Sequence, residues 1–159
     1  MLDLLRVGPG HEEAVLAFEK DNRAYFAESI NDRGDSFFEE YPERHRALMA
    51  EQEAGISAFY VLIDGHGAVV GRFNLYDIVN GSAEVGYRIA ERVSGRGVAT
   101  TGVRTLCRNA REDIGLSTLT AATSNENVAS QRVLLKAGFS YVAPTDVAGY
   151  EGALSPSLL

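Results

Sequence analysis

The sequence predicts a single α/β domain, residues 1–159, in which a mixed and mostly antiparallel sheet is flanked by about four helices. The first observation behind this prediction is length, because 159 residues is about the size of one domain. The second is composition, since 45% of the residues are apolar and 23% are charged, as in an ordinary globular protein. The third is the hydrophobic period, which changes along the chain from helical spacing to strand alternation and back.

The first third of the chain is predicted to form one short strand and two helices. Residues 2–7 have the length of a strand, and residues 11–30 carry apolar side chains on recurring helical faces. Turn-forming residues at 31–34 end this first helix. Asp35 is a suitable cap for a second helix, which Gly55 ends.

Three consecutive antiparallel strands are predicted next. They lie at residues 57–63, 68–79 and 82–90, and glycine-rich turn chemistry separates the first two. The Asn80-Gly81 pair between the second and third strands is the strongest hairpin signal in the chain.

The last third of the chain alternates helices with strands. Residues 98–113 and 126–137 are predicted helices, and residues 116–123 are a predicted strand between them. A sixth strand is expected to begin at residues 139–142. The tail, residues 143–159, carries two prolines and predicts at most a short last strand.

Charge and composition exclude several classes of protein. The formal net charge of −7 argues against general binding to nucleic acid or to an anionic membrane surface. The longest apolar run, residues 58–63, has the length of a strand, and residues 1–6 lack the basic start of a signal peptide. Cys107, the one cysteine, lies in an apolar stripe and is expected to pack in the core. We therefore expect a cytoplasmic protein with no membrane or nucleic-acid partner.

No pattern in the sequence indicates a metal site. No cysteine and histidine have the spacing of metal ligands. The three histidines, His11, His45 and His66, are far apart in the chain and are expected at the surface.

The most informative segment joins the third predicted strand to the next helix, and its sequence is Ser94-Gly95-Arg96-Gly97-Val98-Ala99-Thr100. Glycines let the backbone approach an anion closely, and the first turn of a helix presents unpaired N–H groups at the positive end of its dipole. The segment thus predicts a phosphate-binding loop, with a simple chain turn as the alternative. A Walker A loop is excluded because no Gly-Lys-Ser/Thr triplet occurs. A dinucleotide fingerprint is excluded because Thr100 stands where a third glycine is needed.

The segment resembles the acetyl-CoA loop of the GNAT superfamily of N-acetyltransferases, Gln/Arg-x-x-Gly-x-Gly/Ala. Residues 92–97 match the letters, whereas residues 94–99 lack the initial Gln or Arg but place the helix correctly, and we prefer the second register. That register resembles the branch with the ribosomal-protein alanine N-acetyltransferases. Residues 83–89 and 127–139 resemble two further blocks of this branch. The resemblance covers about residues 57–142, the expected cofactor-binding core.

The resemblance implies acetyl-CoA as the cofactor. Backbone N–H groups of residues 96–100 would hold the pyrophosphate, with Arg96 adding a charged contact. The pantetheine arm would pair with the main chain of Tyr87 and Ile89, and an N–H near Tyr87 would stabilise the oxyanion. The expected cofactor contacts are Tyr87, Ile89, Ser94, Gly95, Arg96, Gly97, Val98, Ala99, Thr100, Asn127, Ser130 and Lys136.

Two residues are candidate catalytic groups. Glu84, the one acidic residue inside the third strand, would take a proton from the amine directly or through water. Alternatively, it is an exposed glutamate paired with Arg72 or Arg88. Ser130 would return a proton to the CoA thiolate, because Leu134 stands where some family members carry a tyrosine. Alternatively, Ser130 makes a local backbone bond at the start of its helix.

Two polar residues of the last helix have two interpretations each. Asn127 is expected to cap this helix, to bind cofactor and substrate, or to do both. Lys136 either reaches a CoA phosphate or belongs to the plain surface.

The acceptor pocket is expected on one face of the second long strand. Arg72, Asn74 and Tyr76 share this face beside Glu84, and would line the pocket unless they form a solvated face. Aromatic residues of the first two helices would complete the wall: Tyr25, Phe26, Phe37, Phe38 and Tyr41. A cluster of Arg88, Arg92 and Arg96 is expected to face phosphate.

The predicted function is therefore N-acetyl transfer from acetyl-CoA to a primary amine. The acceptor would be a protein N-terminal amine or, alternatively, a small-molecule amine such as an antibiotic or an amino acid. A non-catalytic module that only binds acyl-CoA is the other alternative, and it predicts binding without CoA release. Edge strands of such a sheet would allow a homodimer.

Overall fold

The computed structural model describes residues 2–124, 127–144 and 147–153, and within them seven strands form one sheet in the order β1-β2-β3-β4-β5-β7-β6. The β4–β5 pair is parallel and every other pair is antiparallel, which confirms the predicted mixed sheet. The strands are β1 Asp3–Arg6, β2 Ala58–Ile63, β3 Val69–Val79, β4 Ser82–Ile89, β5 Thr118–Ser124, β6 Ser140–Pro144 and β7 Val147–Ala153.

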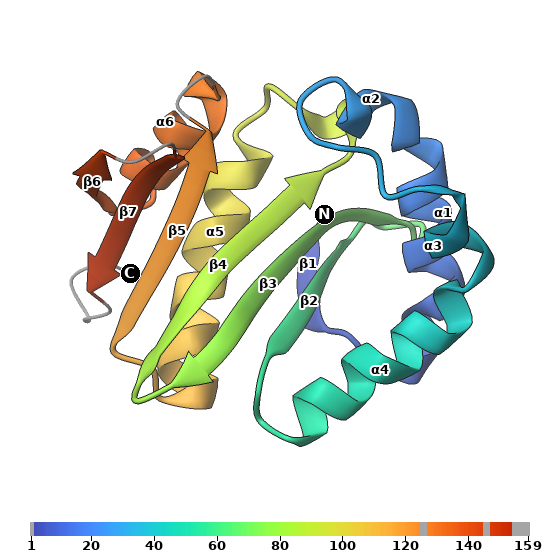
Figure 1. The fold of residues 1–159 in the computed structure, drawn as a ribbon, viewed down its shortest axis with the longest axis horizontal. Helices are drawn as coiled ribbons and strands as arrows, with labels where there is room; N and C mark the ends of the chain where they lie inside the picture. The colour runs from blue at the N-terminus through green and yellow to red at the C-terminus, as the bar shows by residue number, and fades with distance from the viewer. Residues whose placement is uncertain (1, 125–126, 145–146, 154–159) are drawn as a thin grey trace.

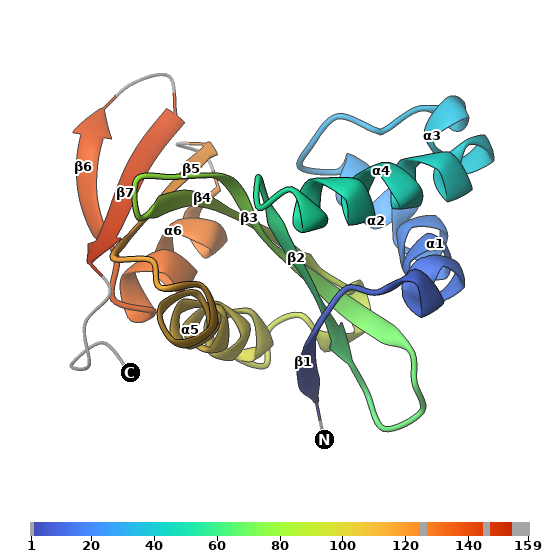
Figure 2. The same cartoon turned by 90° about the horizontal axis from the view of Figure 1, so that it is seen from below.

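Helices cover both faces of the sheet. The helices α1 to α4 lie over one face, and α5 and α6 lie over the other (Figure 2). Their bounds are α1 Glu12–Asp21, α2 Arg23–Ala27, α3 Asp35–Glu39, α4 Tyr41–Glu53, α5 Val98–Asn109 and α6 Val128–Lys136. Three short segments complete the list. Segment η1 Pro9–His11 precedes α1, η2 Glu91–Val93 precedes the loop before α5, and η3 Ala110–Ile114 extends α5. No helix within these described residues is long and apolar enough to cross a bilayer.

The helices predicted at 11–30 and from Asp35 to Gly55 are each divided in two, so the estimate of about four helices is too low. The first division falls at Asn22, whose side chain donates to the Phe18 carbonyl over 2.9 Å and accepts from the Glu91 N–H over 3.0 Å. The second division falls just before Pro42, which has no N–H to continue the ladder of α3. One distant contact, at Asn22, and one local feature, at Pro42, therefore break helices that hydrophobic spacing alone predicts as continuous.

The β3–β4 hairpin confirms the Asn80-Gly81 signal. Asn80 and Gly81 both have positive φ, 49° and 76°, and Val79 pairs with Ser82 across the turn. Positive φ at both central residues is what a two-residue turn of this type requires.

The last strand in the C-terminal tail, β7, has seven residues and is longer than the short strand that the sequence suggests. β7 pairs with β5 on one side and with β6 on the other, so it lies between two strands that precede it in the chain. Gly149 and Gly152 weaken the strand pattern of this segment. Residues 145–146 and 154–159 of the predicted tail lie outside the described part.

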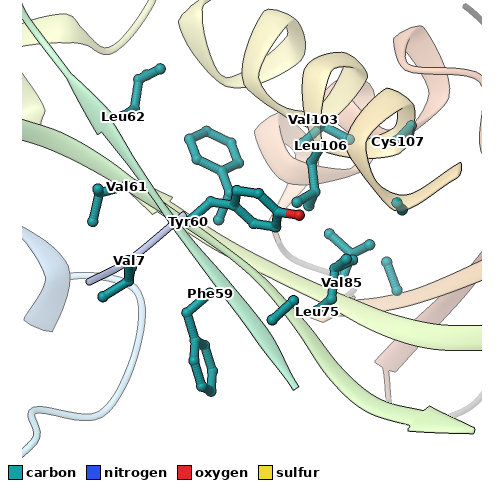
Figure 3. Close-up of a cluster of buried hydrophobic side chains, with 14 of the residues drawn as sticks. Val7, Phe59, Tyr60, Val61, Leu62, Leu75, Val85, Val103, Leu106 and Cys107 are labelled. Carbon is teal, nitrogen blue, oxygen red and sulfur yellow. The ribbon is translucent and has the colours of Figure 1, made fainter. Parts of the chain in front are cut away.

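The core extends over both faces of the sheet, and one part of it lies between the sheet and α5 (Figure 3). Val103, Leu106 and Cys107 of α5 point at Leu75 and Val85 of the sheet. The packing role of Cys107 is confirmed, and burial raises the pKa of its thiol to about 11.

His45 corrects the expectation that the histidines lie at the surface, because its ring lies on the buried face of α4. The ring nitrogens lie 3.0 Å from the Tyr41 hydroxyl and 3.0 Å from the Gly8 carbonyl. Its position at helical spacing from Tyr41 places it on the buried face. These two bonds satisfy the imidazole and tie α4 to the chain before α1.

Candidate active site

A cavity of about 950 Å³ lies where α2, β3, β4, the start of α5 and α6 meet. Its wall includes side chains from both faces of the sheet, for example Asn74 from the side of α1 and Ser130 from α6. Such a cavity admits two ligands from opposite sides of one sheet.

The gap in the sheet comes from the divergence of β4 and β5. Their pairing ends at Val85 with Ala121, yet both strands continue, and their ends separate (Figure 1). The Ala90 N–H donates to the Val70 carbonyl of β3 over 2.8 Å. Because hydrogen-bonding direction alternates along a strand, the main-chain groups of Tyr87 and Ile89 face away from β3, toward the gap. Main-chain donors and acceptors therefore line the gap, as the sequence analysis expects for these two residues.

The glycine loop, residues 94–100, closes one end of the cavity. Gly95 and Gly97 have φ values of 73° and 75°, a conformation that favours glycine. The Thr101 N–H makes the first bond of α5, to the Gly97 carbonyl, so the N–H groups of residues 98–100 precede the helical ladder. All residues of the loop except Arg96 line the cavity, and Arg96 is exposed outside it. These groups fit an anion such as a pyrophosphate.

Asn127 and Ser130 meet Tyr87 at the start of α6. The Ser130 N–H donates to Asn127 Oδ1 over 3.0 Å, which makes Asn127 the cap of α6. The Ser130 and Tyr87 hydroxyls lie 3.1 Å apart, and the Tyr87 ring stacks on Phe73 at 5.7 Å. Burial raises the pKa of Tyr87, so its hydroxyl stays protonated at neutral pH. Lys136, at the far end of α6, is exposed and also lines the cavity.

The expected acceptor residues lie together on the opposite face. Arg72, Asn74 and Tyr76 all line the cavity, and Arg72 and Asn74 are buried. Asn74 Nδ2 donates to the Tyr76 hydroxyl over 2.8 Å. The Tyr76 ring covers Gly86, where an added Cβ would lie 2.8 Å from the ring. Arg72 and Asn74 thus form a buried wall rather than a solvated strand face, whereas Tyr76 beside them is 38% exposed.

A buried carboxylate, Glu19 of α1, organises the arginines of this wall. Its oxygens lie 2.8 Å from Arg72, 2.9 Å from Arg33 and 3.1 Å from Arg88. Burial alone would raise the pKa of Glu19, but the three guanidinium groups outweigh it and hold that pKa below its usual range. Glu19 and Arg33 are not among the residues predicted from the sequence, although a glutamate four residues after the buried Val15 was a usable signal.

Two parts of the predicted arginine cluster are wrong. Arg88 binds Glu19, and Arg92 pairs with Asp64 over 2.9 Å, so neither faces a phosphate site. Arg92 and two backbone N–H groups lower the pKa of Asp64 to about 2. Each arginine therefore has a carboxylate partner that sequence spacing does not reveal.

Glu84 and Leu134 lie apart from this centre. Glu84 is exposed at the paired end of β4 and is absent from the cavity wall, so a direct contact with a bound amine is not part of this arrangement. Arg72 and Arg88 pair with Glu19, not with Glu84. Leu134 is buried in the core of the protein.

The predicted aromatic wall divides into two groups. Tyr25 and Phe26 of α2 line the cavity. Phe37 and Tyr41 are buried in the core, and Phe38 packs against it, so these three lie outside the cavity wall. Helix α2 therefore supplies the aromatic surface that the two predicted helices were expected to share.

Comparison with known proteins agrees with this geometry. Residues 3–140 match the family described as the acetyltransferase (GNAT) domain. A probable N-acetyltransferase of Bacillus subtilis, YjcK, is 27% identical over 139 residues, which cover 80% of this chain and 74% of that protein.

Two solved structures share the fold. The ribosomal-protein-S5-alanine acetyltransferase from Vibrio fischeri superposes with a TM-score of 0.87 at 16% identity, over 98% of this chain and 94% of that one. The ribosomal L7/L12 alpha-N-protein acetyltransferase RimL, solved with coenzyme A, gives 0.84 at 17% identity, over 96% and 94% of the two chains. Since the family match spans most of the sequence, the chain belongs to the GNAT family of acetyltransferases, which transfer the acetyl group of acetyl-CoA to an amine.

Proposed function

We propose that this protein acetylates a primary amine inside the cavity between β4 and α6, by direct transfer from acetyl-CoA. The observation that carries the proposal is the cavity itself, which joins three features. These are the glycine loop, the free main-chain edge at Tyr87 and Ile89, and the hydroxyl pair of Tyr87 and Ser130. A phosphate-holding end, a peptide-like edge and a proton donor in one space match the parts of a long acyl-CoA substrate.

Residues at the start of α5 and at the start of α6 would hold acetyl-CoA, which supplies an acetyl group activated as a thioester. The N–H groups of residues 98–100 and the positive end of the α5 dipole bind the pyrophosphate, with Ser94, Gly95 and Gly97 shaping the loop. Two exposed cations offer charge to the phosphate groups: Arg96 from outside the cavity and Lys136 from its wall. Tyr87, Ile89 and Asn127 contribute polar groups along the arm.

Three groups would handle the charge and protons of the reaction. The Tyr87 N–H, directed at the gap, stabilises negative charge that develops on the carbonyl oxygen in the transition state. The Ser130 hydroxyl gives a proton to the departing sulfur, and the Tyr87 hydroxyl at 3.1 Å orients it. Glu84 takes the proton of the amine. Its exposed side chain lies outside the cavity wall, so a water molecule relays this proton.

Measured release of CoA with a panel of amines tests this proposal. We expect Ser130→Ala to lower kcat roughly 100- to 10,000-fold while acetyl-CoA binding changes little, as for loss of a general acid. Tyr87→Phe keeps the ring stacked on Phe73 and removes only the hydroxyl, so its loss of kcat should be smaller. Thr105→Ala, which removes an exposed hydroxyl bonded within α5, is the control.

Other outcomes of the same assay contradict parts of the proposal. Unchanged turnover in Glu84→Gln would remove Glu84 as the base. Unchanged kcat in Ser130→Ala would do the same for the acid. Binding of acetyl-CoA without CoA release for any amine would indicate a non-catalytic acyl-CoA-binding module.

The range of acceptors includes protein N-terminal amines and small molecules. Two structural neighbours are named for acetylating ribosomal proteins, and a small amine fits the same chemistry. We also propose a cytoplasmic location, supported by a chain with one cysteine that is buried as a thiol. A homodimer through the β1 edge is supported by the exposed apolar side chains of Leu2 and Leu5, and the mass in solution tests it.

A further inference from the structure

The acceptor side of the cavity carries local positive charge in a chain whose net charge is −7. Arg33, Arg72 and Arg88 line the cavity and converge on the single carboxylate of Glu19, which leaves two positive charges uncompensated. Among the described residues, Glu28 is the only acidic residue that lines the cavity, and it is exposed just after the C-terminal end of α2. A surplus of guanidinium groups in a binding cavity, one of them buried and two partly exposed, points to an anionic ligand group.

Arg33 and Arg88 are positioned to contact such a group. Arg33 stacks over the Phe37 ring at 4.5 Å, and Arg88 stacks over the Phe26 ring at 4.7 Å. Stacking fixes the face of each guanidinium and leaves its N–H edge for hydrogen bonds. Glu19 takes two of the five donors of Arg33 and one of those of Arg88. Their side chains are 32% and 21% exposed, whereas Arg72 is 7% exposed and lies beneath them.

Two buried polar atoms beside the arginines have no partner among the described residues. They are Arg72 Nε, a donor, and Asn74 Oδ1, an acceptor. Both residues are buried and line the cavity, and Asn74 is oriented by its bond to the Tyr76 hydroxyl. Buried polar atoms are rarely left unpaired in native proteins. A ligand that presents an N–H and an anionic oxygen to this wall would satisfy both atoms.

We propose that the acceptor of this enzyme is an amine that carries a carboxylate a few bonds from the nitrogen. Arg33 and Arg88, held by Glu19, bind the carboxylate, and Asn74 Oδ1 accepts a hydrogen bond from the amine. A polyamine without a carboxylate is rejected, because it would bring positive charge against the arginines. This inference rests on the proposed function and names its substrate class.

Two kinds of acceptor carry this chemistry, and matched pairs distinguish them. The first pair is a free amino acid and its carboxamide, for example alanine and alaninamide. The second pair is a peptide with an acidic second residue and its amide counterpart, Ala-Asp-Ala-amide and Ala-Asn-Ala-amide. Spermidine is the cationic control. We expect kcat/KM for the better carboxylate acceptor to exceed that of its amide by roughly tenfold or more, the discrimination typical of charge-assisted hydrogen bonds.

Arg33→Gln is the variant of choice, since Arg33 is the most exposed of the three arginines. We expect it to lower kcat/KM for the carboxylate acceptor roughly tenfold, chiefly through KM, and to lower that for the amide acceptor much less. Arg92→Gln is the matched control, because Arg92 pairs with Asp64 outside the cavity wall. A second readout needs no turnover: with CoA present, N-acetylalanine should raise the Tm of the wild type and not that of Arg33→Gln.

The outcomes separate the two proposals. Equal rates for each carboxylate and its amide, or a preference for spermidine, would overturn the substrate class and leave acetyl transfer intact. The same holds if Arg33→Gln lowers both members of a pair equally. Binding of acetyl-CoA with no turnover of any acceptor would overturn the proposed function, and this inference with it.

Discussion

Glu19 has the largest electrostatic role of any side chain described here. It is 1% exposed and its three partners come from three separate segments, two of them 53 and 69 residues further along the chain. A buried carboxylate is tolerated only when its partners compensate for the lost hydration. Sequence spacing cannot reveal such partners, and this is why the alternative interpretation of Glu84 paired it with arginines that in fact bind Glu19.

Replacing Glu19 should make the protein less stable in a pH-dependent way. Glu19→Gln leaves the buried Arg72 without its counter-ion, and we expect a loss of about 3–5 kcal/mol in the free energy of unfolding at pH 7. Because the folded-state pKa of Glu19 is lowered, its contribution is complete above the ordinary value of 4.5 and is lost as the pH falls through the folded pKa. Urea unfolding from pH 7 downward should therefore show wild type and variant converging in acid.

Glu53→Gln, an exposed position at the end of α4, is the control and should change little. A constant difference between wild type and Glu19→Gln at all pH values would show that the ionised carboxylate is not the source of the stability.

Among the elements, α5 brings its backbone into direct contact with a side chain of the sheet. An added Cβ at Gly102 would lie 2.3 Å from Cζ of Phe73, so the helix backbone and this ring are in direct contact. Phe73 in turn stacks on Tyr87, at an angle of 11° between the rings. The position of α5, and of the glycine loop at its start, is thereby fixed relative to β4.

Gly102→Ala should destabilise the protein despite the better helix propensity of alanine. We expect a loss of about 1–3 kcal/mol from overpacking, larger than the gain of up to ~1 kcal/mol from propensity. Phe73→Leu removes the ring and should make Gly102→Ala less harmful, which a double-mutant cycle in urea measures. Additive effects of the two substitutions would contradict the contact.

Local signals predicted the elements that depend on local chemistry. The Asn80-Gly81 turn, the glycine loop and the last helix all follow from residues adjacent in the chain. The division at Asn22 does not, because its partner is the Glu91 N–H, 69 residues away. The place of β7 between β5 and β6 is likewise set by pairing with distant strands, so hydrophobic alternation could not predict it.

At the scale of the whole molecule, one sheet separates two layers of helices (Figure 2). The residues that line the cavity come from both layers. The glycine loop and α6 belong to one layer, and α2 with the arginine wall belongs to the other. Binding of one ligand should therefore stabilise the whole domain rather than one element.

Acetyl-CoA should raise the thermal stability of the folded chain. At about 100 times its dissociation constant a ligand adds roughly 2.7 kcal/mol, a rise in Tm of roughly 5 to 10 °C for a chain of this size. ATP and NADPH at equal concentration should give smaller shifts. Melting curves followed by circular dichroism provide the measurement.

Two glycine variants with the same backbone strain locate the effect. Gly97→Ala and Gly55→Ala both replace a glycine with positive φ and open space around its Cβ. Each should lower the Tm of the free protein by a similar amount. Only Gly97→Ala should lose the acetyl-CoA shift, and an equal loss in Gly55→Ala would mean that the glycine loop is not the binding site.

The early end of the β4–β5 pairing has a consequence for how such a protein can change over time. The slot beside Tyr87 and Ile89 is made of peptide groups, which every amino acid except proline supplies in full. Substitutions along β4 can therefore replace one side chain after another while the slot persists. Inheritance of this feature leaves little trace in residue identities, and it is compatible with a shared fold at 16% identity. Novelty in acceptor choice can then arise from the arginine wall alone, without disturbing the half of the cavity that faces α5.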